Sequence, residues 1–371
     1  MDFLVEKADN TAHVLNAGET AFTSAFSFVK HILNKELILD HILVTGGAGY
    51  VGSGLLRELL SENYIVTCVD NLMFGGESLL DIWHNKNFNF IKCDVNDYDS
   101  FNDVLISNKF DAIIHLAAIV GDPACRLYAD LANKTNWDST KWLLDKCVEL
   151  DIPKFVFAST CSNYGKMDDP ESYVDENSTL APVSLYAELK VKFEKYMLNE
   201  IEKKSNFSPT SLRFSTVYGL SPRMRFDLTV NEFTKDLALG RELVIFGEKF
   251  WRPYCHVKDF SNAFITVLRS PMNKVAYNVF NVGDTSENYT KQMLVDEIQK
   301  AIPEANIKYV DKNEDPRDYR VNSDKIKREL GFEITMRVPD GIEEVKRMVQ
   351  EGVIQDPEDQ RYYNIPHERQ N

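Results

Sequence analysis

The feature that most constrains the fold is a glycine-rich loop between an apolar strand and a helix. The stretch "HILVTG" predicts a buried strand and "YVGSGLLRELLSE" predicts a helix; Gly46, Gly49 and Gly52 lie around the junction as G-x-x-G-x-x-G. Glycine permits the tight turn, lets a phosphate approach bare backbone and lets the helix pack close to the strand. The start of the helix offers unpaired N–H groups to an anion. In this context a dinucleotide site is favoured over a merely tight turn.

The alternation of predicted strands and helices continues along the chain. Further strands are predicted in "YIVTCVD", "FNFIKCDV", "FDAIIHLAA", "KFVFAST" and "TSLRFSTVYG". Apolar strands separated by helices indicate an α/β fold with a Rossmann-type, doubly wound parallel sheet covered on both faces. We expect a dinucleotide-binding domain at 41–218 that carries the catalytic residues. Residues 219–350 are expected mainly to form a smaller substrate-binding α/β domain, with some exchange of chain between the two.

The two ends of the chain differ from this pattern. Residues 1–40 contain "TAFTSAFSFVKHILNKEL", whose apolar spacing predicts an amphipathic helix in an N-terminal extension. This helix would pack on the rest of the protein, mediate association with another protein chain or be a partly ordered extension. Residues 351–371 are polar, and we expect them to run as an extended tail on the surface.

The second strand ends in Asp70, which favours NAD over NADP. A carboxylate there accepts hydrogen bonds from a ribose diol and repels a 2′-phosphate. Asp94 and Val95 follow the third strand and are placed to touch the adenine, and small residues after the fourth strand leave room for the cofactor. His115 within that fourth strand is expected to be a packed core residue. The predicted cofactor contacts so far are Gly46, Gly49, Tyr50, Val51, Gly52, Asp70, Asn71, Asp94, Val95, Leu116, Ala117 and Ala118.

A tyrosine and a lysine on one helix face suggest the chemistry. In "PVSLYAELKVKFEKY", Tyr186 and Lys190 are four residues apart near the start of a predicted helix. Alone they would be a solvated surface pair. Beside NAD, the lysine charge and the helix end would lower the pKa of the phenol, which could then take a proton from a sugar hydroxyl. Thr160, at the end of the fifth strand, would hold the same hydroxyl oxygen, and Lys190 would also bind the nicotinamide ribose.

From His41 to about Gln350 the chain resembles the extended short-chain dehydrogenase/reductase family, in its nucleotide-sugar epimerase and dehydratase branch. The motifs that carry the resemblance are "TGGAGYVG", "HLAA", "STCSNYG", "YAELK", "LRFSTVYG" and "RPYCHVKD". The resemblance implies NAD as cofactor and Thr160, Tyr186 and Lys190 as the catalytic trio. It also implies that the substrate is a nucleotide sugar.

The resemblance further suggests where the substrate would bind. Phe214 matches a position near the nicotinamide, and Thr216 stands where many members have an asparagine on the substrate diphosphate. Asn231 matches a second such asparagine, while Arg252 and Arg317 resemble arginines that clamp the diphosphate; each arginine alone would be a surface ion pair. Weaker expectations are Arg225 on the substrate and Asp122 on the sugar, the latter against a turn-capping role. The predicted substrate contacts are Asp122, Thr160, Cys161, Thr216, Arg225, Asn231, Arg252 and Arg317.

Cys161 and Ser162 separate the possible reactions. Family dehydratases place an Asp–Glu pair directly after the threonine, and decarboxylases carry a glutamate at the second of those positions. Some epimerases working at C3 and C5 use a cysteine at the place of Ser162. Cys161 is therefore expected to be a small packing or substrate-facing residue and not a proton carrier.

These residues favour a nucleotide-sugar 4-epimerase that oxidises and re-reduces C4. The alternatives are a C4 dehydrogenase, possibly of a heptose nucleotide, that releases a 4-keto sugar, and an NAD-sensing binding protein without turnover. The complete trio disfavours the last.

Composition indicates which partners and which cellular compartment to expect for the protein. The 371 residues carry a formal net charge of −15, which disfavours nucleic acid as a partner. Six scattered cysteines without a C-x-x-C pair predict reduced thiols, a cytoplasmic location and no metal site. No segment has the length and apolarity of a membrane span, and the N-terminus lacks the pattern of a secretory signal. The resemblance also implies a homodimer formed by the helical segments around 137–150 and 186–201.

Overall fold

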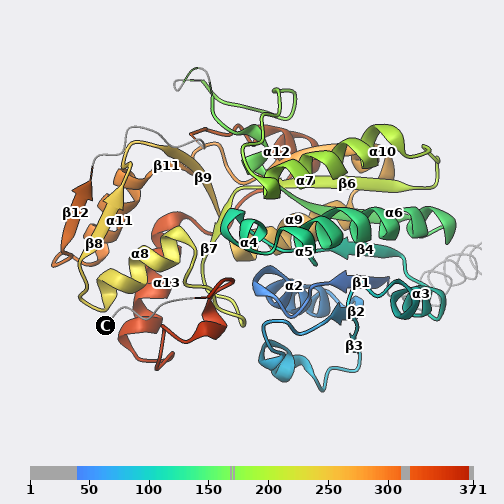
Figure 1. Ribbon diagram of the computed structural model, residues 1–371, viewed down its shortest axis with the longest axis horizontal. Coiled ribbons are helices and arrows are strands. Elements are labelled where there is room, and N and C mark those ends of the chain that lie inside the picture. The colour runs from blue at the N-terminus through green and yellow to red at the C-terminus, as the bar shows by residue number, and fades with distance from the viewer. Residues whose placement is uncertain (1–39, 168, 170–171, 311–317, 367–371) are drawn as a thin grey trace, which may run out of the picture. The chain divides into compact units, whose positions relative to one another are not determined.

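The computed structural model describes residues 40–167, 169, 172–310 and 318–366. The expected N-terminal helix within 1–40 lies outside these residues. The described residues from His41 onward belong to one compact unit. Figure 1 shows it as a central sheet with helices on both faces, continued at one side by a smaller group of strands and helices.

The central sheet has seven strands in the order β10-β6-β5-β4-β1-β2-β3, and every neighbouring pair is parallel. The strands are β1 (His41–Thr45), β2 (Ile65–Asp70), β3 (Phe88–Lys92), β4 (Ala112–His115), β5 (Lys154–Thr160), β6 (Ser208–Phe214) and β10 (Asn278–Val282). The chain reverses direction across the sheet between β1 and β4, so a crevice opens where their carboxyl ends diverge. The predicted doubly wound parallel sheet is confirmed.

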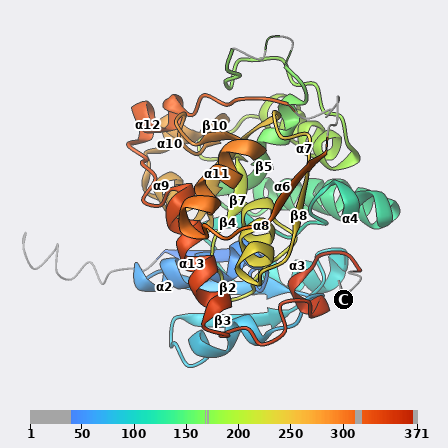
Figure 2. The ribbon, with the colours of Figure 1, turned by 90° about the vertical axis from the view of Figure 1, so that its left-hand side faces the viewer.

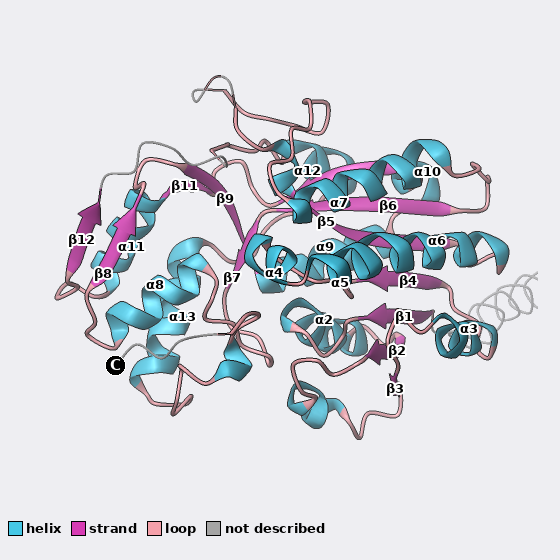
Figure 3. Cartoon of the chain, viewed as in Figure 1, coloured by secondary structure: helices cyan, strands magenta, loops and turns pink. Residues whose placement is uncertain are grey.

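Helices cover both faces of this sheet (Figure 3), and a buried apolar cluster lies on each face. On one face, α2 (Tyr50–Ser61) and α9 (Val257–Arg269) pack on β1, β2 and β10, with η1 (Glu77–Ile82), α10 (Met272–Val275) and α12 (Asp324–Leu330) beside them. On the other face lie α3 (Tyr98–Ile106), α6 (Thr140–Glu149) and α7 (Leu185–Lys195). The strands are apolar on both sides because both sides are buried.

Further helical segments extend this second face. They are α4 (Asp122–Leu127), α5 (Ala129–Asn133), the π-helical turns η2 (Lys134–Ser139) and η4 (Tyr196–Glu200), and the 3₁₀ turn η3 (Cys161–Tyr164). The turns η2 and η4 continue directly into α6 and out of α7, so the two long helices on this face are each extended by an irregular turn.

The remaining elements form a smaller lobe with its own apolar core, on the left in Figure 1 and facing the viewer in Figure 2. Its strands are β7 (Thr216–Tyr218), β9 (Trp251–His256) and β11 (Asn288–Thr290) in one sheet and β8 (Leu243–Phe246) and β12 (Ile307–Val310) in another. Its helices are α8 (Thr229–Ala238), α11 (Lys291–Ala301) and α13 (Val338–Gln350). Strand β10 and helix α9, which follow β9 along the chain, return to the central sheet.

The C-terminal segment differs from the expected surface tail. After α13 the chain makes a short 3₁₀ turn, η5 (Gln360–Tyr362), and Tyr363 is 5% exposed. The Tyr363 hydroxyl accepts a hydrogen bond from Lys235 Nζ at 3.1 Å, and that ammonium pairs with Glu358. Aromatic side chains in the polar sequence thus fasten residues 358–365 onto the smaller lobe.

Candidate active site

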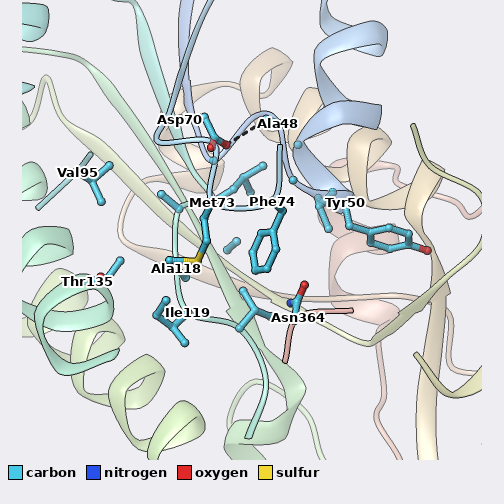
Figure 4. A pocket seen from close by; sticks show the side chains of 18 of the residues that line it. Ala48, Tyr50, Asp70, Met73, Phe74, Val95, Ala118, Ile119, Thr135 and Asn364 are labelled. Atoms are coloured by element: carbon cyan, nitrogen blue, oxygen red, sulfur yellow. Dashed lines mark hydrogen bonds between the residues drawn. The ribbon is translucent and has the colours of Figure 1, made fainter. Parts of the chain in front are cut away.

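One cavity lies at the carboxyl ends of the central strands and brings most of the predicted site residues together. Its wall includes the glycine loop, the ends of β2 and β4, the end of β5 and the start of α7. The predicted residues that line it are Gly46, Gly49, Tyr50, Val51, Gly52, Asp70, Asn71, Asp94, Val95, Leu116, Ala117, Ala118, Thr160, Tyr186, Lys190, Phe214 and Arg225. Figure 4 shows part of this wall, with Asp70 beside the glycine loop.

The glycine loop leaves room that other residues would fill. Gly46 has a φ of +72°, and a Cβ there would stand 2.7 Å from the backbone N of Ala117. At Gly52 a Cβ would stand 2.4 Å from the carbonyl oxygen of Gly46, so α2 can lie against the loop only because this residue has no side chain. Helix α2 starts after Gly49 with no side chain capping it. The loop therefore presents bare backbone and free N–H groups of a helix to the cavity, which fits a dinucleotide pyrophosphate.

Asp70 is held in place by the backbone of both neighbouring loops. Its Oδ2 accepts a hydrogen bond from the Ala48 N–H at 3.0 Å, and its Oδ1 accepts one from the Leu72 N–H at 2.8 Å. Burial raises the pKa of this carboxyl, and the two backbone donors oppose the shift. The next loop is tied to β3 through Asn71 Nδ2, which donates to Asp94 Oδ2 at 3.1 Å. The carboxylate is thus fixed at the edge of the cavity where the sequence analysis expects a ribose diol.

Tyr186 and Lys190 both line the cavity from α7. Ser184 caps this helix by accepting a hydrogen bond from the Ala187 N–H, which sets the start of the helix at Leu185, directly before the tyrosine. Lys190 Nζ donates to the carbonyl oxygen of Ala158 at 2.6 Å and lies 5.8 Å from the centre of the Tyr186 ring. Thr160 ends β5 at the same place, and its Oγ1 accepts from the Ser162 N–H at 3.1 Å.

The direction of the tyrosine pKa differs from the expectation. Burial raises the pKa of Tyr186, and the nearby Asp122 and Cys125 raise it further. Burial also lowers the pKa of Lys190 to about 8. Loss of hydration disfavours both charged forms, and the charge of Arg225, which lowers the pKa of Tyr186, does not offset it.

A buried ion pair anchors the helix that carries these residues. Arg213 of β6 and Glu194 of α7 meet at 2.7 Å with side chains 5% and 1% exposed. Glu194 Oε1 also accepts hydrogen bonds from Ser211 Oγ and Asn163 Nδ2, so its remaining acceptor capacity is filled. Breaking a satisfied buried pair costs several kcal/mol, about 3–5. The network therefore holds α7 in a fixed position on the sheet.

His115 is a packed residue, as the sequence predicts. It is 2% exposed, and its two ring nitrogens are hydrogen-bonded to Thr45 Oγ1 and Thr140 Oγ1 at 2.8 and 2.9 Å. Burial lowers its pKa to about 3, so the ring is neutral at physiological pH. Among the residues described, no cluster of His, Cys, Asp or Glu could hold a metal ion.

Two predicted substrate contacts are corrected by the structure. Cys161 is 1% exposed and its Sγ donates to the carbonyl oxygen of Arg213 at 3.2 Å, so the thiol faces the protein interior and not the cavity. Burial raises its pKa. Asn231 is fully buried; its Oδ1 accepts from the Gly219 N–H at 2.8 Å and its Nδ2 donates to the carbonyl oxygen of Arg225 at 2.9 Å. Its amide shapes a loop beside the cavity and cannot also reach a ligand.

The other predicted substrate contacts lie around the cavity or outside the described chain. Asp122 lies close to the start of α7, where its Oδ1 accepts a hydrogen bond from Ser184 Oγ at 2.7 Å. Arg252 stacks over Tyr319, with 5.4 Å between guanidinium and ring centre, and neither it nor Thr216 of β7 lines the cavity. Arg225 does line it and forms a bidentate pair with Asp227 at 2.8 Å. Arg317 lies outside the described residues.

Several lining residues were missed by the sequence reasoning. They include Met73 and Phe74 in the loop after β2, Arg223 in the loop after β7, and Asn364 near the C-terminus. Figure 4 shows Phe74 and Asn364 facing each other at the cavity. "SPRMR", with two arginines directly after a strand of the sheet, was the available signal for Arg223. The polar tail gave none for Asn364.

Comparisons with known proteins agree with this site. Residues 42–283 match the model of the NAD dependent epimerase/dehydratase family. A relative from Oryza sativa, named "Probable UDP-arabinose 4-epimerase 3", is 29% identical over 79% of this chain and 78% of its own length. The UDP-glucose 4-epimerase of Thermotoga maritima, solved with UDP-glucose, superposes with a TM-score of 0.73 at 26% identity and covers 84% of this chain and 99% of its own. The dTDP-glucose 4,6-dehydratase DesIV of Streptomyces venezuelae, solved with NAD, has a TM-score of 0.72 at 25% identity over 84% of this chain and 97% of its own.

The family match spans most of the central sheet and includes Thr160, Tyr186 and Lys190, and it covers well over half of the chain. The glycine loop and the fixed aspartate suit the binding of a dinucleotide, which agrees with the NAD dependence in the name of this family. The chain therefore belongs to the NAD dependent epimerase/dehydratase family and is an NAD-dependent enzyme of nucleotide-sugar chemistry.

Proposed function

We propose that this protein is a nucleotide-sugar 4-epimerase. One observation carries the choice of reaction: Thr160, Tyr186 and Lys190 line the same cavity as the glycine loop, while the thiol that follows Thr160 is turned into the interior. Elimination of water across C5 and C6 needs an acid and a base beyond the tyrosine. The positions that supply them in dehydratases hold Cys161 and Ser162, a buried thiol and a hydroxyl that does not titrate near neutral pH.

The proposed roles of the site follow from the positions of its side chains. NAD would be held by the glycine loop and Asp70, and when bound it accepts a hydride from the sugar and returns it. Tyr186 Oη takes the proton of the C4 hydroxyl and gives it back, while Thr160 Oγ1 hydrogen-bonds the same oxygen. Lys190 places a positive charge near the Tyr186 ring and stabilises the phenolate before it takes the proton and after it has given the proton back.

The raised pKa of Tyr186 fits a group that is deprotonated only when the site is assembled. A neutral phenol is the resting state, and additional positive charge close to the ring would favour the phenolate. A buried lysine whose pKa is about 8 keeps most of its charge at pH 7. Lys190 therefore remains charged and can stabilise the phenolate near neutral pH.

The experiment is incubation of the protein with UDP-linked sugars in deuterated water, because both 4-epimerases named above are named for UDP-linked sugars. A 4-epimerase gives the C4 epimer with no solvent deuterium on carbon, since the same hydride returns. Deuterium at C5, a 6-deoxy-4-keto product, or release of a 4-keto sugar with accumulation of NADH would each contradict the proposal. Tyr186→Phe, which removes one oxygen, is the control for conversion by a contaminating enzyme.

We also propose that the protein is a homodimer that works in the cytoplasm. All six cysteines are free and buried, which suits a reducing compartment. For the interface, α6 and α7 remain the candidates; Leu143 and Cys147 are fully buried within the chain, so only the outer sides are available. There Lys192 Nζ lies 3.8 Å from the centre of the Trp137 ring. Sedimentation velocity at micromolar concentration tests the homodimer, and a monomer would contradict it.

No helix within the described residues is long and apolar enough to cross a membrane.

A further inference from the structure

A buried arginine in the cavity wall has hydrogen-bonding capacity that the protein does not use. Arg223 is 7% exposed and lines the cavity, yet its Nε has no partner. Within the described residues it also forms no ion pair, and the nearby Asp227 is taken by both arms of Arg225. A buried cation without a counter-charge is costly. Burial accordingly lowers the pKa of Arg223 to about 10.

The position of this arginine relates it to the glycine loop. Its backbone N–H donates to Ser53 Oγ at 3.3 Å, in the first turn of α2. Ser221, two residues earlier, binds the same Ser53 hydroxyl at 3.0 Å and donates to the carbonyl oxygen of Tyr50. The guanidinium lies over Phe74, 4.4 Å from the ring centre, in the loop after β2. The side chain therefore lies near the helix start that offers free N–H groups to an anion.

The C-terminal segment holds this side chain in place. Arg223 Nη1 donates to Asn364 Oδ1 at 2.9 Å, and Asn364 itself lines the cavity opposite Phe74 (Figure 4). Two hydrogen bonds dock the segment on the same loop, one from the Phe226 N–H to the Tyr362 carbonyl and one from the Asn364 N–H to the side-chain Oδ2 of Asp227. Ile365 then packs in the apolar cluster that includes Tyr186. The segment thus runs from the smaller lobe to the catalytic helix.

An amide is a suitable partner for a guanidinium that must remain available. It accepts one hydrogen bond and orients the side chain, but it leaves the positive charge uncompensated, whereas a carboxylate would neutralise it. A planar guanidinium with free donors beside a helix N-terminus fits a phosphate group. The cofactor of this family carries two adjacent phosphates.

We propose that Arg223, positioned by Asn364 of the C-terminal segment, is a diphosphate-binding residue for the bound NAD, so that the C-terminal segment is part of the cofactor site. The inference deepens the proposed function but rests only on NAD binding and not on epimerisation. In a 4-epimerase the consequence is tight retention of the cofactor while the 4-keto sugar turns.

The test measures binding and needs no turnover. Purified protein is equilibrated with isotopically labelled NAD, and ADP or adenosine is added to displace it. The ratio of the two half-displacing concentrations within one variant reports the diphosphate contribution, because the affinity for NAD cancels. UDP and uridine are compared in a parallel experiment in which they displace labelled UDP, which separates the cofactor's diphosphate from that of a nucleotide sugar.

The variants are Arg223→Gln, Arg223→Lys, Asn364→Asp and the control Arg361→Gln. The control removes an exposed arginine, paired with Asp359, from the same segment. Arg223→Gln should reduce the adenosine-to-ADP ratio roughly ten- to hundredfold, the effect of losing charge-assisted hydrogen bonds. Arg223→Lys should have an adenosine-to-ADP ratio only slightly below that of the wild type, and Arg361→Gln should have the wild-type ratio. Asn364→Asp should reduce the ratio while Arg223 stays in place.

Three outcomes would overturn the proposal. The first is an unchanged adenosine-to-ADP ratio in a folded Arg223→Gln protein. The second is a loss confined to the uridine-to-UDP ratio, which would assign the arginine to the substrate. The third applies if Arg223→Gln does not fold, because Asn364→Asp is then the deciding variant. An adenosine-to-ADP ratio equal to that of the wild type in Asn364→Asp would then refute the proposal. A protein that passes this test but fails to epimerise any sugar would contradict the proposed function and leave the inference standing.

Discussion

Replacement of Gly46 by alanine should damage both stability and cofactor binding, for two separable reasons. The residue has a φ of +72°, which costs an L-residue with a Cβ about 1–2 kcal/mol. The new Cβ would also stand 2.7 Å from the backbone N and 2.9 Å from the Cα of Ala117. These are backbone atoms that cannot rotate away, so the strand end must shift, an overpacking cost of about 1–3 kcal/mol.

Gly240→Ala isolates the first of these costs, that of the backbone conformation. Gly240 has nearly the same φ, +74°, but a Cβ there meets nothing within 4 Å. We therefore expect Gly240→Ala to lower the free energy of unfolding by about 1–2 kcal/mol, through the backbone alone. Gly46→Ala should lower it by about 2–5 kcal/mol, so the two variants should differ by the overpacking cost.

The two variants should differ more clearly in cofactor binding. Ala117 lines the cavity, so its displacement in Gly46→Ala should lower the affinity for NAD by about tenfold or more. Gly240→Ala should bind NAD with the affinity of the wild type. Urea unfolding of the three proteins gives the stabilities, and exchange with labelled NAD gives the affinities. Equal losses of stability together with unchanged NAD affinity in Gly46→Ala would refute the close approach of the loop and β4 as the reason for glycine.

The remaining predictions concern the catalytic helix and its surroundings. Tyr186→Phe should lower kcat by about 10²- to 10⁴-fold with NAD still bound, and near-normal turnover in a coupled assay would exclude the assigned base. Asp70→Asn keeps the shape of the side chain but removes its charge, so the preference for NAD over NADP should narrow in direct titrations; an unchanged preference would mean that the carboxylate does not read the ribose. Cys161→Ala should leave kcat within about twofold, since the thiol is buried away from the cavity; a large loss of kcat in a stable protein would show that the thiol takes part. Because burial lowers the pKa of Lys190 to about 8, the unfolded chain binds more protons than the native one between that pH and the ordinary lysine range. The stability of the wild type relative to Lys190→Met should therefore rise as pH increases from about 8 to 10, and a flat difference in urea unfolding would contradict a buried ammonium.

The fold and the main site were encoded locally in the sequence. Strand periodicity, the spacing of Gly46, Gly49 and Gly52 and the Asp70 at the end of the next strand each depend on a few neighbouring residues. Parallel strands then deliver their carboxyl ends to one edge whatever the details of packing. Tyr186 and Lys190 are likewise neighbours on one helix face, so sequence spacing alone places them together.

What the sequence left open depended on contacts between residues far apart in the chain. Whether Cys161 faced the cavity or the interior, and whether Asn231 was free to bind, was decided by partners in other elements, Arg213 and Gly219. The pKa of Tyr186 depended on how much water the fold excludes, and motif spacing carries no information about burial.

The C-terminal segment shows the same division most clearly. Polar composition predicts a surface tail, yet Asn364 reaches a cavity whose other lining residues all lie more than a hundred positions earlier in the chain. Its hydrogen bond to Arg223 spans 141 positions. Local pattern determined the sheet, the cofactor loop and the catalytic helix, because their geometry repeats over a few residues. Only the tertiary structure decided which side chains close the cavity, because that depends on the packing of the smaller lobe against the sheet.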